Sequence, residues 1–510
     1  MKKIVTLLLI LCISQASFSQ SNGVPEKQKQ TAFGKVDFLS IEMPGNEANM
    51  GFTGIHYNLN LTDWGAYAGV GLYGAVTGIR GGFFTLGVNA GVKEYLSDRF
   101  FTDLGFHFGG GGGAGAPDGG GAFILPHVNM GYDFKDFMVQ AGWSYVNFFD
   151  GGAIKSSQFN VGIEIPLDYE YANYKASEQS FDNKALKNSG WDQAAKKNSL
   201  LFHLNNLKIQ GRTQRTSGQR YNGETIRLAG FEFASFFDEN WFAFLKVDGA
   251  YHGIQAGFMD VFLGAGYLYS FNQNRTNILA KFSMGAGGGG GIETNGGFLV
   301  QPDISIEQKL FGDFFIAINK GYVFSPNSDV NTSSYGLGLK YYIQRNGIFT
   351  ADQSFDNLVF KGITVSMKHD LYFDAQRDNR SPKDLHQISL QVDFDLSKRL
   401  YAAGQTSFAN FGEAGAYAEG LVGLGLRSKA FFNNSTKLFA QVLGGAAGGG
   451  GISTGEGFIV KPSLGFSTKI NDQLNFRTAA GYVKASGGGL STTLVNFGLS
   501  YNISLLKRSN

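Results

Sequence analysis

Hydrophobic and polar residues alternate with a period of two along most of the chain. In the segment HQISLQVDFDL (386–396), apolar side chains from Ile388 to Leu396 occupy every second position, and polar ones lie between them. A period of two places apolar and polar side chains on opposite faces of a β-strand. Helical periodicity is nearly absent, apart from a charged stretch at 174–198 that is compatible with a short helix. The same alternation as in 386–396 covers 159–165, 335–343 and 494–505.

Short segments rich in Asn, Asp, Ser and Gly interrupt this alternation at short intervals, as hairpin turns do. Neighbouring strands that are joined by such short connections pair in an antiparallel direction. The sequence therefore predicts an all-β, antiparallel fold.

A glycine-rich motif occurs three times. It is GGGGGAGAPDGGGAFILP at 109–126, GAGGGGGIETNGGFLVQP at 285–302 and GGAAGGGGISTGEGFIVKP at 444–462. Each copy has a glycine run, a short polar insert, a Phe and a Pro, and a strand with a central glycine follows further along. Such recurrence indicates that one structural unit is repeated. The landmarks of the three copies are Gly111, Phe123, Pro126 and Gly162; Gly289, Phe298, Pro302 and Gly338; and Gly449, Phe458, Pro462 and Gly498.

The repeated units are predicted to cover 32–168, 200–345 and 358–506, with polar connectors at 169–199 and 346–357. Each unit has room for about eight strands. Two arrangements fit this organisation: one large barrel of about 24 strands, or three linked barrels or sandwiches. In the third unit the strands are expected to start near Phe360, His386, Leu400, Tyr417, Thr436, Gly457, Gln473 and Thr493.

The glycine runs do not fit a nucleotide-binding loop. A P-loop needs a Lys followed by Ser or Thr directly after the glycines, and a dinucleotide-binding motif needs a helix there. Ala114, Ile292 and Ile452 occupy this region, and strands are predicted to follow. We expect an architectural role instead, in which the missing side chains let another backbone or a ring approach closely, or let a strand bend at a barrel corner. No nucleotide is expected as a partner.

The N-terminus and the composition narrow the class of protein. The chain begins MKKIVTLLLILCISQASFSQ, which predicts a secretory signal peptide at 1–19. The only cysteine, Cys12, lies within it, so the mature chain is expected to have no disulfide and no thiolate metal site. Of 510 residues 73 are Gly and only 9 are Pro, which argues against a disordered linker. The net charge is +2 and the charged residues are dispersed, so the sequence predicts no basic surface for binding nucleic acid.

No constellation of reactive side chains stands out. The histidines form no short metal-binding spacing, although His107 and His127 flank the first glycine run, and no G-x-S-x-G elbow is present. The sequence therefore predicts no catalytic, cofactor-binding or metal-binding residues, no cofactor and no enzyme activity, with a barrel lipid hydrolase as a minor alternative. Single carboxylates on solvated strand faces are expected at Asp393, Asp395 and Glu164, and a hairpin-like segment at 325–334 offers calcium ligands at Asp329, Asn331 and Ser333.

Amphipathic strands fit two environments. In an outer-membrane barrel the apolar face contacts lipid, whereas in a soluble barrel or sandwich it forms the core. The segment VNFGLSYNISL (495–505) resembles the closing strand of bacterial outer-membrane β-barrel proteins, although the chain departs from them by ending in KRSN (507–510) and not in an aromatic residue. The signal peptide with its SFSQ ending resembles those of exported proteins of Bacteroidetes-type bacteria.

This resemblance implies a non-enzymatic outer-membrane β-barrel protein that acts as a channel or as a structural component of the envelope. Its implied partners are outer-membrane lipid or an outer-membrane protein complex. The alternative is an accessory subunit of a large translocon such as the type 9 secretion system, acting as a plug or docking protein in the periplasm or at the periphery of the outer membrane. Short connections and polar connectors favour this alternative, while the length of the alternating segments and the abundant aromatic residues favour the membrane barrel.

Overall fold

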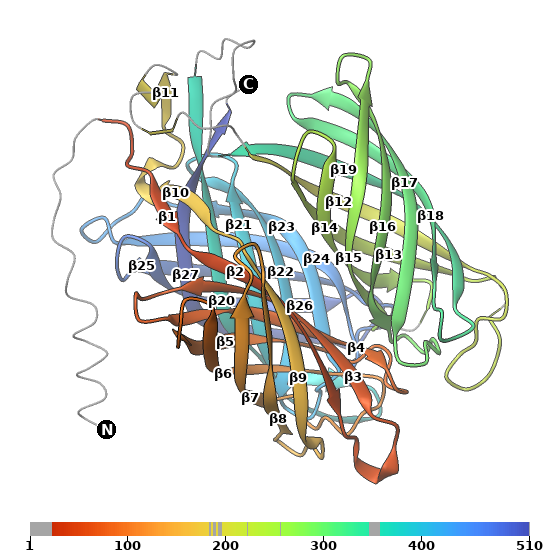
Figure 1. The fold of residues 1–510 in the computed structure, drawn as a ribbon. Helices are drawn as coiled ribbons and strands as arrows, with labels where there is room; N and C mark the ends of the chain where they lie inside the picture. The colour runs from red at the N-terminus through yellow and green to blue at the C-terminus, as the bar shows by residue number, and fades with distance from the viewer. Residues whose placement is uncertain are drawn as a thin grey trace.

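The protein folds into three closed, antiparallel β-barrels that lie side by side (Figure 1). The computed structural model describes residues 23–182, 185–186, 190–191, 196–221, 223–254, 257–345 and 357–508. Strands β2 to β9 form barrel 1, β12 to β19 form barrel 2, and β20 to β27 form barrel 3; in each barrel the first strand pairs with the last. The predicted all-β fold of three eight-stranded repeats is confirmed. Of the two arrangements left open by the sequence, the structure has three separate barrels and not one large one.

The strands of the barrels have the following bounds. Barrel 1 consists of β2 (Ala32–Ile41), β3 (Met50–Asn60), β4 (Ala66–Thr77), β5 (Phe84–Tyr95), β6 (Phe100–Gly112), β7 (Phe123–Asp133), β8 (Met138–Phe148) and β9 (Lys155–Pro166). Barrel 2 consists of β12 (Lys196–Ile209), β13 (Thr225–Phe236), β14 (Trp241–His252), β15 (Met259–Phe271), β16 (Thr276–Gly288), β17 (Phe298–Phe311), β18 (Phe314–Phe324) and β19 (Asn331–Arg345). Barrel 3 consists of β20 (Asn357–Arg377), β21 (Arg380–Asp395), β22 (Leu400–Phe411), β23 (Ala418–Arg427), β24 (Thr436–Gly448), β25 (Phe458–Lys469), β26 (Leu474–Ala485) and β27 (Ser491–Arg508).

Each barrel has two different ends. The chain enters and leaves every barrel at the end that we call the turn end, where most other connections are short turns. The opposite end, the loop end, has longer hairpin loops in barrels 1 and 2 and carries all three glycine-rich motifs, at 113–122, 289–297 and 449–457. The turns of the turn end are 61–65, 96–99 and 134–137 in barrel 1, 237–240, 272–275 and 312–313 in barrel 2, and 396–399, 428–435 and 470–473 in barrel 3.

Small elements outside the barrels cover the turn end of barrel 3. Strand β10 (Tyr169–Asn173) pairs with both β27 and the N-terminal strand β1 (Gln28–Gln30), and β11 (Ser180–Asp182) pairs with β20. Within the described part of the charged stretch 174–198, η2 (Tyr174–Ala176) is a short 3-10 helix; another, η1 (Pro44–Asn46), lies between β2 and β3. The expected signal peptide and most of the second connector, residues 346–356, lie outside the described residues.

The polarity of the two strand faces is the reverse of that in a soluble barrel. On β9 the apolar side chains of Phe159 and Ile163 point outward and are 57% and 48% exposed, whereas the polar side chains of Asn160 and Glu164 point inward and are buried. The same distribution holds in the other barrels, where Ile304 and Leu464 are exposed on outer faces. An outer surface of this kind is stable in contact with lipid rather than water.

The barrels pack against each other as a closed ring. The third strand of each barrel contacts the fifth strand of the next: β4 contacts β16, β14 contacts β24, and β22 contacts β6. Apolar side chains from all three barrels meet where the ring closes, including Phe84, Val261 and Phe408. The interface is therefore head-to-tail and closes after three units, as in a cyclic trimer, but within one chain.

Glycines allow the backbones of neighbouring barrels to approach closely at the loop end. A Cβ atom on Gly288 would lie 2.6 Å from the carbonyl carbon of Gly81, so barrels 1 and 2 meet there without side chains. Barrels 1 and 3 meet similarly, since the Gly415 N–H donates to the Gly119 carbonyl oxygen at 3.3 Å. Every glycine-rich motif thus packs against the loop between the third and fourth strands of the neighbouring barrel.

The other repeat landmarks occupy related but not identical places. Phe123 is fully buried inside barrel 1, whereas its counterparts Phe298 and Phe458 lie on the outer faces of barrels 2 and 3. The prolines Pro126 and Pro462 both point outward, and barrel 1 has one residue fewer between Phe and Pro. Because side chains alternate along a strand, this single missing residue moves the Phe to the opposite face.

The three strand glycines lie at the seam that closes each barrel. Gly162, Gly338 and Gly498 point inward from the last strand. They pair with residues on the first strand whose polar side chains are buried in the lumen, namely Asp37, His203 and Lys368. A glycine opposite each of these residues leaves room for the polar side chain.

Candidate functional site

The polar faces of the strands form a network of ion pairs inside each barrel. In barrel 3 the fully buried Asp393 carboxylate accepts hydrogen bonds from two guanidinium groups, with Oδ2 at 2.9 Å from Arg427 Nη2 and 2.7 Å from Arg477 Nη1. Arg427 also pairs with Asp395, whose carboxylate accepts a 2.7 Å hydrogen bond from the Tyr174 hydroxyl. This network links three strands and the η2 segment across the turn end of the lumen.

A second group of charges lies further up the lumen of barrel 3. The ammonium group of Lys461 lies 2.6 Å from Asp370 Oδ2 and 3.3 Å from Glu419 Oε2. The hydroxyls of Tyr372 and Tyr417 donate to Glu419, the latter at 2.9 Å. All five side chains are buried, so the Lys461 ammonium group and both carboxylates find their partners within the lumen.

Barrel 2 has a comparable lumen. Lys281 lies between Glu232 and Asp303, at 2.8 and 3.3 Å, and Lys340 lies 2.6 Å from Glu307. These side chains come from four different strands and are buried. Charged groups therefore bridge the barrel from one wall to the other.

In barrel 1 histidines take part in the network. The His56 Nε2 atom lies 3.2 Å from Asp37 Oδ1, and His127 Nε2 lies 3.2 Å from Asp103 Oδ2. His107, at the start of the first glycine run, lies 2.6 Å from the side-chain oxygen of Asn89 through its Nδ1 atom. Both histidines that flank this run thus point into barrel 1.

The expectation of solvated carboxylates is wrong. Asp393 and Glu164 are fully buried and Asp395 is nearly so; Glu164 forms an ion pair with Lys93 and accepts a 2.9 Å hydrogen bond from Gln140. A polar strand face looks the same in sequence whether it meets water or a lumen, and closure of the eight strands is what buries it.

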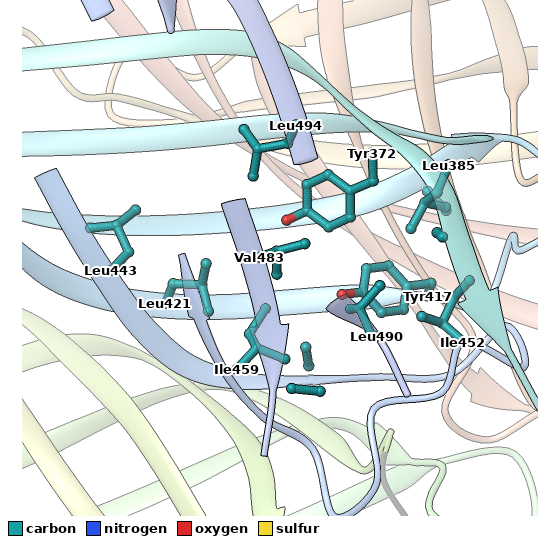
Figure 2. Packing of buried hydrophobic residues seen from close by; sticks show 14 of the residues in the cluster. Tyr372, Leu385, Tyr417, Leu421, Leu443, Ile452, Ile459, Val483, Leu490 and Leu494 are labelled. Atoms are coloured by element: carbon teal, nitrogen blue, oxygen red, sulfur yellow. The ribbon is translucent and has the colours of Figure 1, made fainter. Parts of the chain in front are cut away.

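Apolar side chains close the loop end of each lumen. In barrel 3, Tyr372, Leu385, Tyr417, Ile452 and Leu490 pack together above the charged network (Figure 2). Equivalent buried clusters occur in barrel 1, around Phe52, Phe83, Phe123 and Phe148, and in barrel 2, around Phe258, Phe262, Ile292 and Leu299. An eight-stranded barrel is just wide enough for side chains to fill, and here they do so.

Aromatic side chains gather at both ends of the outer surface. Exposed aromatics at the turn end are Tyr95, Phe100, Phe134, Trp241, Tyr269, Phe271, Phe431 and Phe432. Those at the loop end are Tyr145, Tyr322, Tyr335, Phe373 and Tyr482. Aromatic side chains at the two ends are typical of transmembrane barrels, in which such rings lie at the level of the lipid headgroups. Here further aromatics are exposed between the ends, among them Phe106, Phe282 and Phe497.

The segment with possible calcium ligands forms the loop between β18 and β19. The Asp329 carboxylate accepts a hydrogen bond from Gln214 at 3.4 Å, and Ser333 is already on β19. Over the residues that the structure describes, no group of three or more His, Cys, Asp or Glu residues is arranged to hold a metal ion. In this same part of the chain, no helix has the length and apolar character needed to cross a membrane.

One buried carboxylate lies at the loop end, close to the contact between barrels 1 and 3. Asp118 lies in the glycine-rich loop of barrel 1, is only 8% exposed, and accepts a 2.8 Å hydrogen bond from the Gly113 N–H. Burial raises the pKa of the Asp118 carboxyl to about 7, although backbone N–H donors and the Arg80 guanidinium act in the opposite direction. The folded loop therefore binds a proton more tightly than the unfolded chain.

We expect the protection of this loop against hydrogen exchange to decrease as pH rises from about 4 to about 7. A carboxyl whose pKa is higher in the folded than in the unfolded chain stabilises the folded loop only while it is protonated. A shift from 3.8 to about 7 corresponds to an upper limit of about 4 kcal/mol. Protection factors of the Gly113 and Gly121 amides measure the effect. Asp118→Asn should remove the pH dependence; an unchanged dependence in this variant would exclude Asp118 as the titrating group.

A groove lies on the outer surface between barrels 2 and 3, in the half nearest the loop end. It has a volume of about 680 Å³. Its walls carry Phe202, Leu204, Phe231 and Met259 from barrel 2 and Phe408, Val422 and Phe458 from barrel 3, and Phe84 of barrel 1 lies at its base. Small residues line it between these side chains, including Ala229, Gly249, Gly420 and Gly444. We call this feature the interbarrel groove.

No protein-family model matches the chain, and no curated protein matches its sequence. Among solved structures, the ferric enterobactin receptor PfeA in complex with BCV-L6 has 9% identity, with 95% of this chain and 82% of that chain covered and a TM-score of 0.30. The siderophore receptor PirA from Acinetobacter baumannii has 7% identity, coverage of 95% and 81%, and a TM-score of 0.28. Pseudomonas aeruginosa OpdQ has 8% identity, coverage of 94% and 98%, and a TM-score of 0.22.

Proposed function

We propose that the protein is a non-enzymatic, integral outer-membrane component that acts as a structural platform and not as a diffusion channel. The observation that supports this proposal is the distribution of polarity: apolar outer faces with exposed aromatic side chains toward both ends, and lumens filled by ion pairs and closed by apolar side chains. A soluble protein rarely exposes large continuous apolar surfaces. A channel needs an open polar path, and here Lys461, Asp370 and their neighbours occupy it.

The two barrel ends support one orientation in the membrane. Outer-membrane barrels have short turns and both chain ends on the periplasmic side, and longer loops outside. We therefore place the turn end, with β1, β10 and β11, in the periplasm and the loop end with its glycine-rich motifs at the cell surface. A Bacteroidetes origin and the alternative role at a type 9 translocon stay predictions, and no contact in the structure favours the latter.

Reconstitution into lipid bilayers tests this proposal. We expect the mature protein to resist carbonate extraction, to migrate differently on a gel with and without heating, and to give no stepwise current in planar bilayers, because side chains fill an eight-stranded barrel. Protein that washes off the membrane would contradict the membrane location. Stable, reproducible conductance steps would contradict the sealed lumens while leaving the membrane location intact.

A further inference from the structure

The interbarrel groove has the shape and chemistry of a lipid-binding site. Its walls belong to the outer faces of barrels 2 and 3, which elsewhere expose apolar side chains such as Ile304 and Leu464. Small residues hollow both walls: Ala229 and Gly249 on one side face Gly420 and Gly444 on the other. A Cβ atom added to Gly420 would meet no other atom within 4 Å, so the space in front of it is open.

The charged side chains on the outer faces that line the groove lie at its mouth, at the loop end, whereas Thr406 is a polar residue within the wall. Arg227 and His252 are paired residues of β13 and β14 and both line the mouth. His252 is paired with Glu456 from the glycine-rich loop of barrel 3, which fixes the two walls to each other. Arg227 is exposed and has no ion-pair partner anywhere in the described ranges. The mouth therefore presents a guanidinium group that no carboxylate of the described residues holds in an ion pair.

We propose that the interbarrel groove binds an anionic phospholipid, with an acyl chain between barrels 2 and 3 and the phosphate at Arg227. An apolar slot of about 680 Å³ is within the size range of ligand pockets. A guanidinium group at its mouth is suited to a phosphate, since it offers several N–H donors to one anion. This inference rests on the proposed membrane location, and it adds a ligand class and a site to it. The lipid fills the space left by the small residues and so completes the contact between two barrels.

Lipid retention can be measured on the folded protein in detergent, independently of membrane insertion. The mature chain is mixed with phosphatidylglycerol or with phosphatidylcholine, and bound lipid is counted by native mass spectrometry. We expect one phosphatidylglycerol to be retained in preference to phosphatidylcholine. Equal, non-saturating retention of both lipids would overturn the proposal, whereas failure of the protein to enter membranes would overturn the proposed function.

Two variants separate the apolar slot from the charged mouth. Gly420→Phe adds a ring at a position where an added Cβ meets no atom within 4 Å, and it should weaken phosphatidylglycerol retention by about tenfold or more. Arg227→Gln should weaken phosphatidylglycerol binding by about threefold and leave phosphatidylcholine binding unchanged, because an exposed ion pair is weak. Matched controls are Ile304→Phe, which adds the same ring to an outer face away from the groove, and Arg275→Gln, at the turn end of barrel 2.

Both controls should bind lipid like the wild type. Heat-modifiable migration checks that all four variants are folded. The proposal is wrong if Gly420→Phe retains phosphatidylglycerol as the wild type does, or if Arg275→Gln reduces retention as much as Arg227→Gln.

Discussion

Replacing Asp393 with alanine is expected to lower the free energy of unfolding by about 3–5 kcal/mol, because two buried guanidinium groups lose the carboxylate that balances them. Asp393 is fully buried and bridges Arg427 and Arg477. Water cannot replace the carboxylate where side chains fill the lumen. A urea titration of the protein in lipid vesicles, followed by heat-modifiable migration, measures the loss.

The matched control is Asp472→Ala on the same barrel. Asp472 is a half-exposed residue in the turn before β26, where it pairs with Lys469 and Lys175. Exposed ion pairs contribute less than about 1 kcal/mol, so this variant should be close to the wild type. A similarly small effect for Asp393→Ala would mean that water enters the lumen, and the description of barrel 3 as sealed would be wrong.

The double substitution Gly288→Val and Gly289→Val is expected to destabilise the fold by about 3 kcal/mol or more. A Cβ on Gly288 would collide with the backbone of Gly81 in barrel 1, and a Cβ on Gly289 would lie 2.1 Å from the Gly257 carbonyl oxygen. Gly289 also has a φ of +91°, which a β-branched residue rarely adopts. Barrels 1 and 2 should therefore lose their contact at the loop end, with a lower thermal midpoint and a smaller folded fraction.

Gly404→Val is the control for this prediction. Gly404 lies on the outer face of β22, its φ is not positive, and an added Cβ would meet no atom within 4 Å. Valine favours strands, so this variant should be as stable as the wild type or slightly more stable. If the double variant has the same thermal midpoint as Gly404→Val, close packing of the glycine run is not what holds the two barrels together.

Local sequence patterns predicted the strands well, because side-chain alternation is a property of each strand by itself. Residues 494–505 lie within β27, and residues 159–165 lie within β9. The expected starts at Leu400 and Thr436 coincide with those of β22 and β24. Repetition of the glycine-rich motif then gave the number of units, since one unit folds much like another.

Contacts between distant parts of the chain could not be predicted in the same way. The seam of barrel 1 pairs Asp37 with Gly162, and no local pattern indicates this pairing. Asp393 finds its partners Arg427 and Arg477 at 34 and 84 residues further along the chain. Its burial follows from barrel closure, which is why a polar strand face was wrongly expected to be solvated. The glycine runs likewise pack against loops of another barrel, and the sequence alone does not indicate which loops these are.

The apolar outer face of each strand, which we propose contacts lipid, is the central feature of the molecule, and cysteine accessibility tests this proposal most directly. Because Cys12 is the only cysteine and lies in the expected signal peptide, single cysteines can be introduced on β9 at Val161 and Ile163, which point outward, and at Asn160, which points inward. In vesicles, a fluorophore at Val161→Cys or Ile163→Cys should be quenched by lipid-borne quenchers, and Asn160→Cys should resist a membrane-impermeant maleimide until the protein unfolds. Rapid labelling of Asn160→Cys from water would indicate an open lumen, and labelling of the outward pair from water without lipid quenching would show that the apolar faces do not contact a membrane.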